Sequence, residues 1–83
     1  MINQSDFNRF SPLKQTQVLF EKGKELMFRH EGEYTVKLYR LSEFFVEIWY
    51  LARINKVLRV EVVSIDDVIH QYESEINIMD LFR

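Results

Sequence analysis

The sequence predicts an α+β fold in which a helix, a four-stranded antiparallel meander and a second helix follow one another, with both helices on one sheet face. Three observations support this prediction. After Gly23 the apolar period changes from helical to two, and residues 44–51 are rich in β-branched and aromatic side chains. Near the end of the chain, helical spacing returns in a stripe made of Ile65, Val68, Ile69 and Tyr72.

A first helix is predicted over residues 12–22. Ser11 can accept a hydrogen bond as the N-cap, and Pro12 suits the first helical position because its missing N–H has no partner there. Upstream of this helix we expect a short turn that docks Phe7 and Phe10 on the core.

The core-facing side of this helix is expected to carry Leu13, Gln17 and Phe20, together with Thr16 and Leu19. Gly23 stands where a glycine commonly ends a helix. After it, Leu26 and Phe28 alternate with Glu25, Met27 and Arg29, so we expect these two side chains to share one face of the first strand.

The strands are predicted over residues 24–30, 34–41, 44–51 and 57–63. A two-residue turn at Ser42 and Glu43 would place Leu41 opposite Phe44, and both faces of this hairpin would then be apolar. A longer turn is the alternative, and it would shift the register by one residue and gather one core face from Val36, Leu38, Val46 and Ile48.

The chain ends with a helix predicted over residues 65–75, for which Ser64 is the candidate cap, and a short turn over residues 78–82. At 83 residues without cysteine, the sequence predicts a single domain, residues 1–83, with a thin core and no disulfides. Small domains of this kind are commonly stabilised by a partner chain.

Two short helices can cover only one side of four strands, so we expect the other face to be open. The interface residues predicted on that face are Val36, Leu38, Phe45, Trp49 and Leu51. Because isolated monomers rarely expose large apolar patches, we expect a homo-oligomer, most simply a symmetric dimer. A different protein partner, or a small ligand bound against the aromatic side chains, would explain the same residues.

Catalytic and metal-binding patterns are weak in this sequence. The serines lie at expected caps and turns, and the two glycines form no phosphate-binding loop. His30 and His70 have too few potential ligands beside them for a metal site, and we expect Glu47 to form a cross-strand charge pair. We therefore predict a non-enzymatic protein without catalytic residues, cofactor or metal.

The net charge of −2 does not favour binding to nucleic acid. The best basic patch for that purpose is Arg53, Lys56 and Arg59 near Trp49, and acids dilute it. The longest apolar stretch is far shorter than a membrane helix, and no signal peptide is visible, so we expect a cytoplasmic protein that does not enter a membrane.

The runs 36–41 and 44–48, with Gly23 before them and Ile76-Asn77-Ile78 after the last helix, resemble a group of short hypothetical bacterial proteins. The similarity involves core and turn positions from Gly23 onward. No activity is assigned to that group, so the resemblance implies a shared fold and no site residues.

Overall fold

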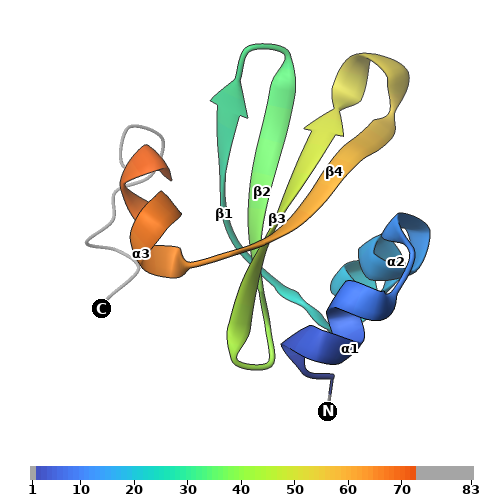
Figure 1. Cartoon of the computed structure of the whole chain (residues 1–83). Coiled ribbons are helices and arrows are strands. Elements are labelled where there is room, and N and C mark those ends of the chain that lie inside the picture. Colours follow the sequence, from blue (N-terminus) through green and yellow to red (C-terminus); the bar gives the residue numbers. More distant parts are fainter. Residues whose placement is uncertain (1, 73–83) are drawn as a thin grey trace.

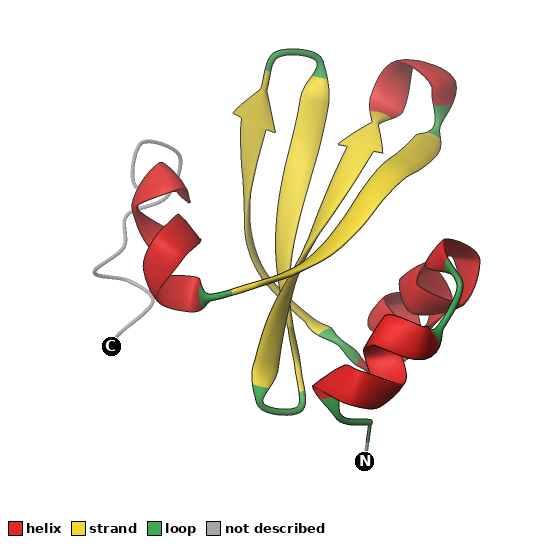
Figure 2. Ribbon diagram, viewed as in Figure 1, coloured by secondary structure: helices red, strands yellow, loops and turns green. Residues whose placement is uncertain are grey.

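The computed structural model describes residues 2–72, which form one sheet with helices on both of its sides (Figure 1, Figure 2). The element order is α1 (Gln4–Arg9), α2 (Pro12–Lys22), β1 (Lys24–Glu31), β2 (Tyr34–Leu41), β3 (Phe44–Leu51), η1 (Ala52–Ile54), β4 (Lys56–Val63), α3 (Ile65–Val68) and η2 (Ile69–Tyr72). The predicted α+β class and four-stranded antiparallel meander are confirmed. The turn predicted over residues 78–82 and the last part of the helix predicted over 65–75 lie outside the described residues.

Side-chain caps set the starts of both N-terminal helices. Asn3 Oδ1 accepts a hydrogen bond of 2.8 Å from the Asp6 backbone N–H, and Ser11 Oγ accepts one of 3.2 Å from the Lys14 N–H. Each bond satisfies a backbone donor that the first helical turn leaves unpaired. α2 therefore begins where the sequence predicts, and the short turn expected before it is a helix, α1, whose Phe7 is fully buried.

The sheet has the strand order β1-β2-β3-β4, so β1 and β4 are its edges. Leu41 lies opposite Phe44, which confirms the two-residue turn and excludes the longer one. Ser42 takes a left-handed conformation, with φ of 56°, to close this turn. Both faces of the hairpin are therefore apolar, because side chains alternate between them along each strand.

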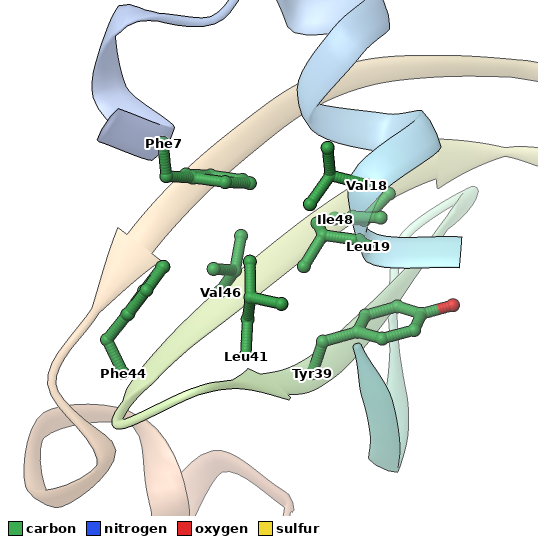
Figure 3. Packing of buried hydrophobic residues seen from close by; sticks show 8 residues of the cluster. All are labelled: Phe7, Val18, Leu19, Tyr39, Leu41, Phe44, Val46 and Ile48. Atoms are coloured by element: carbon green, nitrogen blue, oxygen red, sulfur yellow. The ribbon is translucent and has the colours of Figure 1, made fainter. Parts of the chain in front are cut away.

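One sheet face packs against α1 and α2. Figure 3 shows Phe7, Val18 and Leu19 of the helices pointing toward side chains of β2 and β3. The buried residues of this cluster are Phe7, Val18, Leu19, Tyr39, Leu41, Phe44, Val46 and Ile48. This is the larger of the two cores, and it fixes both N-terminal helices to the sheet.

The opposite face packs against α3 and η2, so the expectation that both helices cover one face is wrong. Leu38 lies under α3 and η2, whereas its chain neighbour Tyr39 lies under α2, and consecutive strand residues point to opposite faces. Figure 1 shows α3 and α2 on different sides of the sheet. Each face carries large apolar side chains, so a helix packed on each face stabilises the fold by removing apolar surface from water. The predicted apolar stripe of the last helix is confirmed, since all four of its residues belong to this second cluster.

The core face of α2 differs from the predicted one. Leu13 and Phe20 are 71% and 61% exposed, and the buried residues are Leu19, which the sequence predicts on this face, and Val18, which it does not. These two residues share a stripe with Gln15, whose polar side chain hides the pattern in the sequence. Gln15 is suited to this position because its Nε2 donates a hydrogen bond of 2.9 Å to the Phe7 carbonyl at the end of α1.

The predicted face shared by Leu26 and Phe28 is also wrong, because Leu26 packs against the cluster beneath α3 and η2 and Phe28 does not. Met27 and Arg29 are buried, and Phe28 is 42% exposed. A register irregularity between Glu25 and Met27 explains the change, because one extra residue exchanges the two faces of a strand. A buried arginine is the consequence.

Candidate functional site

The face beneath α3 and η2 holds a buried group of charged and aromatic side chains. β1 supplies Arg29, β3 supplies Glu47 and η2 supplies Tyr72. Arg29 is 5% exposed, Glu47 is 4% exposed and Tyr72 is 1% exposed. We refer to Arg29, Glu47 and Tyr72 as the buried polar cluster.

Glu47 is the acceptor at the centre of this cluster. The Tyr72 hydroxyl donates a hydrogen bond of 2.6 Å to Glu47 Oε2, and Arg29 Nη2 lies 3.6 Å from the same oxygen. A second carboxylate, that of the exposed Glu31, accepts a bond of 2.5 Å from Arg29 Nη1. The sequence-based expectation of a charge pair for Glu47 considered Lys37, Arg40 and Arg59 on the adjacent strands. It missed Arg29, which belongs to β1 and reaches Glu47 across β2.

Two aromatic rings enclose the Arg29 guanidinium. Its Cζ lies 5.3 Å from the ring centre of Trp49 and 5.4 Å from that of Tyr72. Such contacts stabilise a cation away from water. They compensate in part for Arg29 Nε, which is buried without a hydrogen-bond partner among the described residues.

The pKa of Tyr72 is raised well above its usual value. Burial is the largest cause, the hydrogen bond to Glu47 is the next, and the charge of Arg29 opposes both. The phenol therefore stays protonated and remains a donor to Glu47. Since all three side chains are almost fully buried and bonded to one another, the cluster is suited to holding η2 on the sheet.

Beside the cluster lies a shallow hollow of about 290 Å³ that is lined by Tyr34, Trp49, Leu58 and Arg59. Arg59 Cζ lies 4.2 Å from the Trp49 ring centre, and Tyr34 meets the same ring edge-on at 5.7 Å. The hollow is at the lower limit of size for small-molecule sites. Arg59 already stacks on the ring that a flat ligand would use.

The residues predicted to form an open interface all lie on this face, but most of them are covered. Val36 and Leu38 have no exposed surface, and Leu51 is 6% exposed. Phe45 and Trp49 are half-buried. The expectation of an open face is therefore wrong, because α3 and η2 fold back over the sheet and pack on Met27 and Leu38.

A different surface is both exposed and apolar. A groove of about 560 Å³ runs between the N-terminal half of α2 and the edge strand β4, and it is lined by Pro12, Leu13, Gln15, Thr16, Asn55, Lys56, Val57, Leu58, Arg59 and Val60. Leu13 is 71% exposed and Leu58 is 46% exposed. We call this groove together with the edge of β4 the β4 surface.

Within the described residues, β4 pairs with β3 and with no other strand, so one side of its backbone has no strand partner. Edge strands with unpaired N–H and C=O groups tend to pair with other chains unless charges, prolines or short length prevent it. β4 is eight residues long and contains three charged residues, Lys56, Arg59 and Glu61. β1, the other edge, carries Lys24, Glu25, Arg29 and Glu31, together with His30.

The sequence contained a signal for the β4 surface that the prediction did not use. In a meander, the first and last strands are the edges, and the last strand here is the more apolar one. Leu13 was expected in the core, so its exposure next to β4 was not foreseen. Arg53, Lys56 and Arg59 form no separate basic surface, because Arg53 and Arg59 are paired with Glu33 and Glu61.

No protein-family model matches the sequence, and comparisons with curated proteins and with solved structures found no match. Among residues 2–72, no three histidine, aspartate or glutamate side chains lie close enough together to hold a metal ion. None of the described helices has the length and apolar character needed to span a bilayer.

Proposed function

We propose that this chain is a non-enzymatic protein-interaction module that binds an extended segment of another polypeptide along β4. The observation that carries the proposal is the combination of an apolar edge strand with an apolar groove beside it. An added strand would satisfy the free backbone groups of β4, and its side chains would enter the groove next to Leu13 and Leu58.

The exposed apolar residues favour this surface over the face that holds Trp49. Leu13 and Leu58 border one groove, whereas the buried polar cluster and η2 already occupy the face beneath α3. A bound segment would cover the exposed side chains of Leu13 and Leu58 and so remove apolar surface from water.

Peptides selected from a random library, each about ten residues long to match a strand and its flanks, provide a direct test. A selected peptide is titrated into isotope-labelled protein and the backbone amide shifts are recorded. We expect the shifts to concentrate on residues 56–63 and 12–16. Shifts centred on Trp49 and Tyr34 would instead indicate a ligand site in the hollow and would contradict the proposal, as would the absence of binding up to about 1 mM.

A matched pair of variants distinguishes a loss of binding that is specific to β4 from the effect of placing a charge elsewhere on the surface. Leu58→Lys places a charge on the β4 edge, and Phe28→Lys makes the same change at a residue of similar exposure on the β1 edge. We expect Leu58→Lys to weaken peptide binding about tenfold, since a single anchor contributes on the order of 1–2 kcal/mol. Phe28→Lys should leave the affinity unchanged.

A further inference from the structure

We propose that the polypeptide received by β4 is β4 of a second copy of this chain, paired antiparallel about a two-fold axis at Val60. This inference rests on the proposed function, because it names the partner of the same surface. A two-fold symmetric dimer is the commonest oligomer, and such an interface must be complementary to itself. The charges of β4 meet this requirement in one register.

Backbone geometry first restricts the registers. Along a strand, the backbone N–H and C=O groups of one residue point to one side, and those of the next residue point to the other side. Two opposing residues of an antiparallel pair must both point these groups toward the partner strand or both point them away. The axis therefore passes through a residue and not between two residues. β4 has a bulge near Leu58, opposite the step from Trp49 to Tyr50, so the regular stretch available for pairing begins at Arg59.

Charge then selects among the central positions of this stretch. An axis at Arg59 would place two arginines opposite each other, and an axis at Glu61 would do the same with two glutamates. Like charges that lie directly opposite destabilise a strand pair. An axis at Val60 places Arg59 opposite the partner's Glu61, and symmetry gives this pair twice. Each chain would exchange its own exposed pair, in which Arg59 Nε lies 3.4 Å from Glu61 Oε2, for these pairs between chains.

The remaining residues also fit the register centred on Val60. Leu58, at the bulge, lies beside the partner's Val62 on the face that carries α2, and regular pairing ends there. An axis at Val62 would instead place the charged Glu61 opposite the partner's Val63. The β1 edge is less suited to such pairing, because Arg29 is buried there and is already bonded to Glu31 and Glu47 of its own chain.

The groove gives an independent argument for the same arrangement. Opposing residues of an antiparallel pair lie on the same sheet face, so the two α2 helices would lie on one side of a continuous sheet. The groove reaches Val60, the position of the axis, and the grooves of the two copies would adjoin there. The exposed Leu13 side chains would then be covered, which removes apolar surface from water.

Charge-reversal variants test this register by sedimentation equilibrium. R59E leaves an acidic residue at both positions 59 and 61, and E61R leaves a basic residue at both. Each variant alone should dimerise about tenfold to a hundredfold more weakly than the natural chain, because two opposite-charge pairs become two like-charge pairs. An equimolar mixture should form a mixed dimer, and the double variant R59E/E61R should dimerise like the natural chain.

The outcomes distinguish this inference from the proposed function. If the natural chain stays monomeric while selected peptides still bind along β4, the second-copy inference is overturned and the proposed function stands. A natural dimer whose affinity is unchanged by R59E and by E61R would also overturn it. Because R59E removes the Arg59 contact with Trp49, circular dichroism and the fluorescence of Trp49, the sole tryptophan, verify that each variant is folded.

Discussion

The Tyr72 hydroxyl donates a hydrogen bond of 2.6 Å to Glu47 Oε2, and this bond joins the last described helical turn to the central strand β3. The two residues are 25 positions apart in the chain. Both side chains are buried, so water cannot replace either partner if the other is lost. The bond therefore contributes, together with the apolar packing of Tyr72, to holding η2 on the sheet.

Tyr72→Phe should lower the free energy of unfolding by about 2 kcal/mol, because a buried bond to a charged acceptor is lost while the ring is kept. Urea unfolding followed by circular dichroism measures the change. Tyr50→Phe is the control, since it removes the exposed hydroxyl bond to Asn55 and should cost less than about 1 kcal/mol. Equal effects of the two changes would contradict the role given to Tyr72.

Glu47→Gln should be more severe, with a loss of about 3–5 kcal/mol, because it leaves the buried Arg29 cation without its buried partner. Glu31→Gln is the matched control, as Glu31 also binds Arg29 but its side chain is 59% exposed. We expect the control to cost less than about 1 kcal/mol. Adding Arg29→Met to Glu47→Gln should restore part of the loss, and a double variant no more stable than Glu47→Gln would argue against charge pairing as the cause.

The hairpin from Tyr34 to Leu51 could be predicted from sequence because its apolar run and its turn specify one register locally. Its register is confirmed throughout, from Leu41 opposite Phe44 to Tyr34 opposite Leu51. The location of the last helix could not be predicted in the same way. Whether it crosses to the far face depends on the connection after β4, and its own apolar stripe is compatible with either face.

The candidate sites were harder to predict because each depends on a local irregularity. The irregularity near Leu26 moves Arg29 into the interior, where it meets Glu47. The polar Gln15 hides the true core stripe of α2 and so leaves Leu13 beside β4. Neither effect has a signal in the pattern of apolar residues alone.

Gly23 ends α2 in an extended conformation, with φ of −79° and ψ of 158°, and not in the left-handed one common at helix ends. A Cβ at this position would lie 2.7 Å from the Leu19 carbonyl oxygen. Gly23→Ala should therefore destabilise the fold by about 1–3 kcal/mol, as overpacking against fixed backbone does. Thermal unfolding measures this.

Gly32→Ala serves as the comparison for that variant. Nothing lies within 4 Å of the added Cβ at Gly32, whose φ is 60°. Its cost should come only from the left-handed backbone, about 1–2 kcal/mol. Crystal structures of the two variants would separate the causes, since only Gly23→Ala should displace the end of α2, and an undisplaced helix end would contradict the steric explanation.

Ser42→Gly should stabilise the protein by about 0.5 kcal/mol, because glycine adopts the left-handed conformation of this turn residue without steric strain. The gain is small because glycine also loses more conformational freedom on folding. Ser64→Gly is the control, since Ser64 has φ of −85° and its side chain makes no cap bond. The midpoint of urea unfolding should rise for Ser42→Gly and fall for Ser64→Gly, and a fall for both would show that the turn is not strained.

Stability should decrease steeply above pH 10, because burial and the nearby charge of Glu25 raise the pKa of Tyr39 to about 12. An unfolded tyrosine loses its proton near pH 10, so between pH 10 and pH 12 the folded chain retains a proton that the unfolded chain has lost. The contribution of Tyr39 is therefore complete below pH 10 and is lost as the pH rises through 12. Urea unfolding at several alkaline pH values measures the slope.

Tyr39→Phe should reduce this slope, because the variant has no phenol at position 39 to titrate. Tyr72→Phe should also reduce it, as the pKa of Tyr72 is raised by burial and by its bond to Glu47. Glu25→Gln should have a smaller effect than Tyr39→Phe, since burial is the larger cause of the Tyr39 shift and remains in that variant. An identical alkaline slope in the natural chain and in a chain carrying both tyrosine changes would mean that neither phenol is held protonated by the fold.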